Sequence, residues 1–172
     1  MPKIPKILLS HFRTNHAGET GAIYIYKGIL SVTKHKDIIK FSNEHLKTEL
    51  THLMKIEKIM PKQNISKLIF LWKILGFFTG YFPALIGKKF VYATIFAVES
   101  FVEIHYQNQI DMLSNEQKYS TIRNFIKDLL HDEVKHKEEA VSKIEKLSIV
   151  HKIWGSTVRI GSITAVKISK II

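Results

Sequence analysis

Glutamates on helix faces that are otherwise apolar constrain the fold of this 172-residue chain more than any other feature. In the stretch HAGETGAIYIYKG, helical spacing places Glu19 on one face with Ala22, Ile23 and Tyr26. An apolar helix face normally turns toward the protein interior. A buried carboxylate is costly unless a cation or several hydrogen-bond donors balance it. The pattern therefore predicts a buried group that balances this charge.

Two Glu-x-x-His motifs also lie on apolar helix faces. ELTH contains Glu49 and His52, and EVKH contains Glu133 and His136. Residues three apart are neighbours on a helix surface, so each motif directs a carboxylate and an imidazole toward one point.

The chain consists of two similar halves. Glu99 stands on a further apolar face, so each half has a lone glutamate followed by Glu-x-x-His. The separations are 30 residues, from 19 to 49, and 34 residues, from 99 to 133. Each lone glutamate is followed seven residues later by a tyrosine, Tyr26 or Tyr106. Each separation suits one helix that runs up and a second that runs down.

A pair of metal ions explains this pattern. Carboxylates buried close together repel and take up protons, and cations remove that cost. Carboxylate oxygen and imidazole nitrogen suit iron or manganese. One glutamate from each of two helices and Glu-x-x-His from each of two others is the ferritin-like arrangement. The predicted metal ligands are Glu19, Glu49, His52, Glu99, Glu133 and His136, with Glu49 and Glu133 as bridges.

Other ligand choices remain open at this stage, because one Glu-x-x-His alone is common on the surface of helical proteins. Glu44 and His45 lie one turn before Glu49, and Glu103 lies one turn after Glu99.

Helical spacing of apolar residues extends through most of the chain and predicts an all-α, ferritin-like four-helix bundle with additional hydrophobic membrane-docking helices. We expect one domain over residues 1–172. Pro61 should end the second helix, and Ser114 or Asn115 should cap the fifth. The predicted helices span residues 14–35, 37–59, 66–80, 88–112, 115–145 and 147–170.

The segment 68–87, LIFLWKILGFFTGYFPALIG, is nearly long enough to span a bilayer. Lys73, Pro83 and three glycines within it favour a broken hydrophobic hairpin that lies in the membrane interface or covers the core. A transmembrane helix is the alternative. The final segment alternates basic and apolar residues, which suits either an interfacial helix or an ordinary docking helix.

The charge balance favours an anionic partner. The chain carries 26 Lys and Arg against 15 Asp and Glu, a net charge of +11. No acid occurs between Glu57 and Glu99 or after Glu145, and these stretches are rich in apolar residues. Basic and apolar residues together indicate a membrane surface rather than nucleic acid. A general Lys and Ile bias is the alternative explanation.

The stretch RTNHAGETGA, residues 13–22, resembles the R-x-D-H-A-G-E-x-G-A signature of demethoxyubiquinone hydroxylases. Further similarity follows in LWKILGF, ALIGKK, AVES and HYQNQI, so the resemblance covers nearly the whole chain. Asn15 stands where the family usually has Asp, and Ser100 follows Glu99 where a second acid is common.

The resemblance implies a membrane-associated di-iron monooxygenase of ubiquinone biosynthesis. Its two iron ions would be held by the same six residues, with O2 as co-substrate and NADH or a quinol as reductant. The family's His-Tyr pair, linked to substrate reduction or electron transfer, matches His105 and Tyr106. The substrate would be a polyprenylated demethoxyquinone, and association with other ubiquinone-biosynthesis proteins or with a second copy is a further expectation.

No signal or transit peptide is evident, since MPKIPKILLS is too short for a secretory leader. We therefore expect the cytoplasmic face of a bacterial membrane, with the matrix side of the mitochondrial inner membrane as the alternative. Two other functions stay open: a different ferritin-like oxidase, and a non-catalytic basic helical protein that binds membranes.

Overall fold

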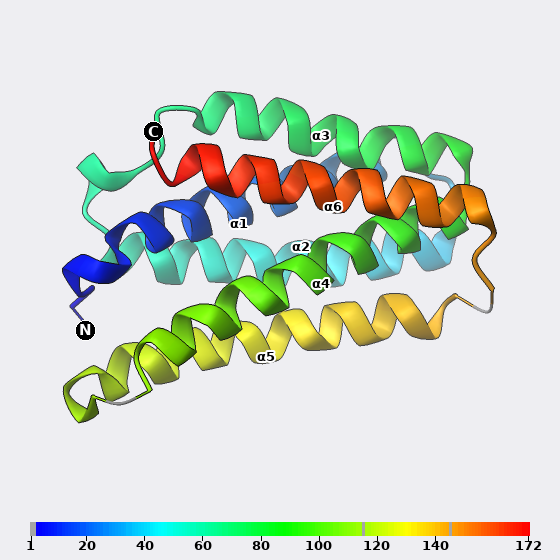
Figure 1. The fold of residues 1–172 in the computed structure, drawn as a ribbon. Helices are drawn as coiled ribbons and strands as arrows, with labels where there is room; N and C mark the ends of the chain where they lie inside the picture. The colour runs from blue at the N-terminus through cyan, green and yellow to red at the C-terminus, as the bar shows by residue number, and fades with distance from the viewer. Residues whose placement is uncertain (1–2, 115, 145) are drawn as a thin grey trace.

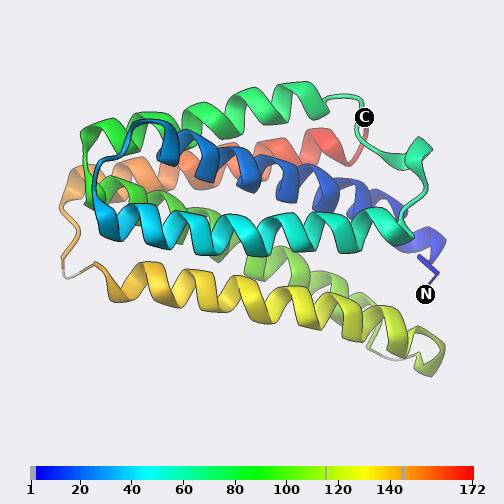
Figure 2. The ribbon, with the colours of Figure 1, turned by 180° about the vertical axis from the view of Figure 1, so that it is seen from behind.

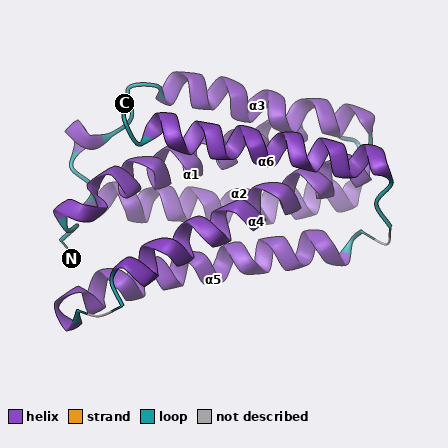
Figure 3. Cartoon of the chain, in the orientation of Figure 1, coloured by secondary structure: helices purple, strands orange, loops and turns teal. Residues whose placement is uncertain are grey.

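The chain folds into helices joined by short loops. The structure, a computed structural model, describes residues 3–114, 116–144 and 146–172. Within these ranges it contains no strand (Figure 3), which confirms the predicted all-α class. The helices are α1 (Leu9–Val32), α2 (Lys36–Ile59), α3 (Ile69–Ile86), α4 (Lys88–Met112), α5 (Ser120–Ser142) and α6 (Ile149–Ser169).

The predicted boundaries of the second, fourth and sixth helices are close to those observed, whereas the first, third and fifth helices differ by up to five or six residues at one end. α2 ends just before Pro61, because proline disfavours helical geometry in the residue that precedes it. α5 begins only at Ser120, after the short 3-10 turn Gln117–Tyr119. The expected ends of this helix, residues 115 and 145, lie outside the described residues.

Four helices form the bundle that the repeated motif predicts. α1 packs on α2 and α4 packs on α5, and the helix backbones lie closer within each of these hairpins than between them (Figures 1 and 2). The wider space between the hairpins is filled by side chains from all four helices.

Two apolar clusters fill the bundle on either side of its middle. One contains Tyr26 of α1, Phe41 of α2 and Ile95 of α4. The other contains Phe12 of α1, Ile56 of α2 and Ile126 of α5. Since the predicted ligands lie between these positions along each helix, a band of polar residues is enclosed by apolar residues at both ends.

α3 and α6 lie along one side of the bundle, where both pack on α1 and α4 (Figures 1 and 2). The prediction of a broken hairpin over residues 68–87 is wrong, because α3 continues through Pro83 to Ile86. Pro83 lies in the last turn, where its missing N–H removes only one helical hydrogen bond. Gly87, at φ 149°, then reverses the chain into α4.

Glycines allow α1 and α3 to pack backbone against backbone. A Cβ atom added at Gly76 would lie 2.4 Å from the carbonyl oxygen of Gly21, and one added at Gly80 would lie 1.9 Å from that of Ile25. Neither position has space for a side chain. The spacing Gly-x-x-x-Gly in α3 thus explains its close contact with the helix that carries Glu19.

We predict that Gly80→Ala lowers the free energy of unfolding by roughly 2 to 3 kcal/mol, because α3 must move away from α1. Gly161→Ala is the matched control in α6, since a Cβ atom there meets nothing within 4 Å. The control should be neutral or stabilising by about 0.5 to 1 kcal/mol, because alanine favours helix. Urea denaturation followed by circular dichroism measures both, and equal effects would contradict the backbone contact.

Candidate di-metal centre

The middle of the bundle gathers the six predicted ligands. α1 supplies Glu19, α2 supplies Glu49 and His52, α4 supplies Glu99, and α5 supplies Glu133 and His136. Each of the six is no more than 5% exposed. The wide space between the two hairpins is therefore lined by carboxylates and imidazoles.

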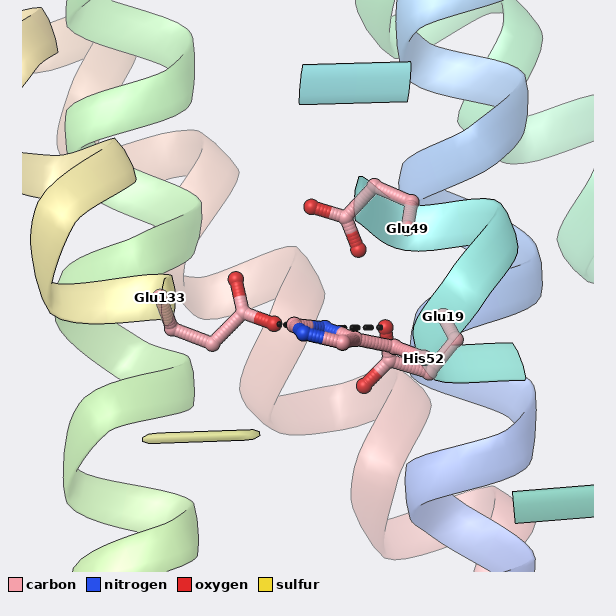
Figure 4. A group of neighbouring side chains, drawn as sticks. All are labelled: Glu19, Glu49, His52 and Glu133. Atoms are coloured by element: carbon pink, nitrogen blue, oxygen red, sulfur yellow. Dashed lines mark hydrogen bonds and ion pairs between the residues drawn. The ribbon is translucent and has the colours of Figure 1, made fainter. Parts of the chain in front are cut away.

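Potential ligand atoms fall into two overlapping groups. In one, a ligand atom from each of Glu19, Glu49, His52 and Glu133 lies within 4.8 Å of the others. Figure 4 shows these four side chains converging from both hairpins. The second group joins Glu49 and Glu133 to Glu99 and His136 within the same distance. Since Glu49 and Glu133 belong to both groups, the arrangement suits two cations that share these carboxylates.

Both histidines turn the same ring nitrogen toward the carboxylates. Nδ1 of His52 lies 2.8 Å from Glu133 Oε1, and Nδ1 of His136 lies 3.1 Å from Glu49 Oε1. On the other side of the His52 ring, Nε2 lies 3.2 Å from Asp132 Oδ2. A carboxylate in this position orients a ligand histidine and increases its basicity.

Asp132 is a residue that the sequence analysis missed. Its position directly before Glu133 in HDEVKH could have indicated this role. Histidines that bind metals commonly donate their second ring N–H to a carboxylate. Only the geometry shows that its partner is His52 of α2 rather than His136 of its own helix.

The pKa values of several ligand residues in the centre are shifted far from their ordinary values. Burial, followed by the charge of Glu133, raises the pKa of Glu49 and of Glu99 well above the ordinary value of 4.5. Burial also opposes ionisation of Glu133, but the adjacent rings of His136 and His52 outweigh it and lower the pKa of Glu133 to about 2. Burial disfavours charge on His52 as well, yet hydrogen bonds with Glu133 and Glu19 raise its pKa to about 12.

These shifts link metal binding to pH. Glu49 and Glu99 hold protons in the folded state at pH values where the unfolded chain releases them. With no cation bound, a rise in pH above about 4.5 therefore destabilises the fold through these two groups. Cations compete with the same protons, so metal affinity should increase with pH.

Several buried ligand atoms in the centre lack hydrogen bonds within the described chain. These atoms are Glu19 Oε2, Glu49 Oε1, Glu99 Oε1, Glu133 Oε2 and His136 Nδ1. Buried polar atoms are rarely left in this state. A pair of divalent or trivalent cations would satisfy them together, so the residues present fit a di-metal group.

The geometry disfavours the competing ligands. Glu44 is exposed on the outside of α2. His45 already engages both ring nitrogens, with Tyr26 Oη at 3.0 Å and Glu139 Oε2 at 3.0 Å. Glu103 pairs with Lys137. His45 instead supports the centre, because its ring stacks on that of His136 with centroids 4.0 Å apart.

The predicted pair His105 and Tyr106 divides between two environments. The hydroxyl group of Tyr106 donates a hydrogen bond to Glu19, which places this tyrosine beside the ligand cluster. Nε2 of His105 instead lies 3.0 Å from Thr14 Oγ1 and 2.9 Å from Asn15 Oδ1. His105 makes no contact with a glutamate of the centre among the described interactions.

A cavity of about 330 Å³ connects the centre with the side of the bundle covered by α3 and α6. Glu19, Glu49, Glu99 and Glu133 border its inner end together with Tyr106. Its remaining lining is mostly apolar or small and includes Trp72, Leu75, Val158, Ala165 and Val166. The shape suits an apolar ring that approaches the carboxylates from this side.

The helical bundle and its central carboxylate–histidine cluster define a ferritin-like protein. Comparison with known families extends this classification. The model of the family described as "Ubiquinone biosynthesis protein COQ7" matches residues 6–169, so the chain belongs to this family.

Curated relatives agree with this assignment. The chain is 30% identical over 162 residues to a human protein named "NADPH-dependent 3-demethoxyubiquinone 3-hydroxylase, mitochondrial", which covers 92% of the chain and 75% of the relative. A Dictyostelium discoideum protein of the same name is 30% identical over 163 residues, 91% of the chain and 74% of the relative. A Rhodospirillum rubrum "3-demethoxyubiquinol 3-hydroxylase" is 25% identical over 170 residues, 96% of the chain and 79% of the relative. The predicted resemblance is confirmed.

We predict that Glu133→Ala reduces bound iron from about two ions per chain to about one or none, because both ligand groups lose a member. Glu103→Ala is the control, since this glutamate pairs with Lys137 outside the centre. Metal analysis of both variants after reconstitution with ferrous iron measures the effect. An unchanged iron content in Glu133→Ala would contradict its assignment as a shared ligand.

Proposed function

We propose that this protein is a di-iron monooxygenase that hydroxylates the ring of a demethoxyubiquinol at a membrane surface. The cavity carries the proposal, because it joins the carboxylate cluster to the apolar side of the bundle. The family membership and the names of the relatives support the substrate class.

The six ligands would hold two iron ions, with Glu49 and Glu133 shared between them. Iron held in this way would supply O2 activation, so that one oxygen atom enters the ring, the second leaves as water, and the quinol provides the two electrons. The protein's own part is to hold the ring beside these residues and to exclude water. The apolar cavity lining serves both purposes.

Tyr106 would act at the inner end of the cavity. Its hydroxyl group is completely buried and donates to Glu19, which fixes the orientation of this carboxylate. Burial, followed by the charge of Glu19, raises the pKa of Tyr106 well above 10. The tyrosine therefore keeps its proton and remains a hydrogen-bond donor at neutral pH.

The outer faces of α3 and α6 suit a lipid surface. Large apolar side chains are exposed along α3, among them Phe70, Phe78 and Phe82, and along α6, among them Ile153 and Ile160. α3 is the one described helix that is long and apolar enough to cross a bilayer, by length and composition alone. Because α3 packs along α1 and α4, we favour docking on the membrane, with α3 and α6 facing the lipid.

Basic residues accompany this apolar surface. Lys73, Lys89, Lys167 and Lys170 are placed on or beside α3 and α6 and would contact acidic headgroups. Lys88 pairs with Asp37 at 2.8 Å, so its charge is already partly balanced within the protein.

The long tail of the substrate would stay in lipid while the ring enters between the two helices. This arrangement would suit either a bacterial or a mitochondrial membrane, since the relatives include both kinds.

An assay with a short-tailed demethoxyubiquinol, O2 and the iron-loaded protein tests the reaction directly. We predict that Ala165→Phe, which fills the cavity from α6, lowers kcat/KM more than about tenfold and leaves the iron content unchanged. Thr164→Phe adds the same ring at the neighbouring exposed position and should retain activity. Iron-dependent O2 consumption without hydroxylated product would instead indicate a different ferritin-like oxidase.

Membrane docking makes a separate prediction. The double variant Phe78→Glu, Phe82→Glu should lose binding to vesicles that contain acidic lipids, because two charges would enter the apolar surface. The matched control is Leu50→Glu, Met54→Glu, which has the same spacing on α2 and comparable exposure. Sedimentation with vesicles measures binding of both. Equal binding by the two variants would rule out α3 as the lipid-facing helix.

A further inference from the structure

A polar cluster that includes His105 borders the cavity and takes no part in the ligand set. Its centre is a reciprocal pair of buried amides, in which Asn15 Nδ2 donates to Gln109 Oε1 at 2.9 Å and Gln109 Nε2 donates to Asn15 Oδ1 at 2.9 Å. Gln109 Nε2 also donates to the carbonyl oxygen of His105 at 3.2 Å. The bond to the His105 carbonyl fixes which end of the Gln109 amide is the NH2 group. The reciprocal bonds of the pair then fix the Asn15 amide in the matching orientation.

The amide pair therefore presents an acceptor to His105. Asn15 Oδ1 lies 2.9 Å from His105 Nε2. Thr14 Oγ1 lies 3.0 Å from the same nitrogen, and Thr14 donates its own proton to the carbonyl oxygen of His11 at 2.6 Å. With two acceptors in front of it, Nε2 must carry the ring proton, and Nδ1 must carry a lone pair.

The surroundings keep the His105 ring neutral and in place. The ring stacks between His11 and Phe101, with centroid distances of 6.0 and 5.9 Å. Burial, aided by the charges of His11 and Lys170, lowers the pKa of His105 to about 4. Nδ1 makes no hydrogen bond with the described residues, and the residue lines the cavity.

Hydrogen-bond donors around the cavity are largely used elsewhere. The hydroxyl groups of Thr79, Thr157 and Ser162 donate to carbonyl oxygens of their own helices. The indole N–H groups of Trp72 and Trp154 donate to Ser66 and Thr94. The cavity thus offers acceptors, the carboxylates and His105 Nδ1, to a ligand that brings its own donor.

We propose that Asn15 and Gln109 are a positioning pair that holds His105 as the Nε2–H tautomer, so that Nδ1 accepts a hydrogen bond from a ring hydroxyl of the bound substrate. The inference rests on the proposed function and refines it. A hydroquinone has a hydroxyl group to donate, whereas the oxidised quinone has only carbonyl oxygens. The pair therefore makes the cavity favour the reduced ring.

The tautomer is measurable without any reaction. We expect a long-range proton–nitrogen NMR spectrum of the 15N-labelled full chain, loaded with diamagnetic zinc, to show His105 protonated on Nε2 alone. His105→Gln identifies its signals among those of the nine histidines. Asn15→Leu and Gln109→Leu should each shift the signals toward a mixture of tautomers. Gln107→Leu is the matched control, because this exposed amide on the same helix donates to Asp111, away from His105.

Ligand binding supplies the second measurement. We expect the anaerobic protein to bind a short-tailed demethoxyubiquinol roughly fivefold more tightly than the matching quinone, the effect of about one neutral hydrogen bond. Asn15→Leu and Gln109→Leu should lose this preference while they retain their metal content and helical circular dichroism, and Gln107→Leu should keep it.

The outcomes separate this inference from the proposed function. A proton on Nδ1 of His105 would overturn it, and so would a preference for the reduced ring that survives in both Asn15→Leu and Gln109→Leu. Failure of the iron-loaded protein to hydroxylate the ring would refute the proposed function alone, because neither the NMR spectrum nor the affinity ratio depends on turnover.

Discussion

The burial of four carboxylates in the middle of a helical bundle is the constraint on which the rest of this structure depends. Burial, followed by the charge of Glu133, raises the pKa of Glu49 and of Glu99, so both carboxyl groups hold protons when no cation is bound. Apolar clusters above and below the band keep water out and make the charges costly. The residues gathered between the two hairpins therefore fit a positively charged group that would balance these carboxylates.

Much of the centre was predictable because it follows from local spacing. A helix repeats every 3.6 residues, so Glu49 and His52 must share a face wherever that helix lies. The apolar neighbours of Glu19 and Glu99 then indicate that the face is buried. All six predicted ligands meet in one place, and the two half-repeats meet as two facing hairpins.

Other features depend on contacts that local spacing does not contain. Asp132 pairs with a histidine 80 residues earlier, and Asn15 pairs with a glutamine 94 residues later. The prediction that residues 68–87 form a broken hairpin was wrong because it assumed that any proline breaks a helix. Pro83 lies in the final turn of α3, where proline disturbs few helical hydrogen bonds. From the sequence alone, the glycines of α3 likewise favour a break in the helix, but in the fold Gly76 and Gly80 allow its close contact with α1.

The contact between α1 and α3 also limits how the cavity can open. Because backbone atoms rather than side chains meet at Gly21, Gly76 and Gly80, α3 cannot slide or tilt without displacing α1. α6 is held differently, since the position of a Cβ atom at Gly155 is 3.8 Å from the nearest atom of α4, an ordinary van der Waals distance. α6 is thus the less closely packed wall of the cavity, whereas α1 and α3 together form a wall joined by direct backbone contact.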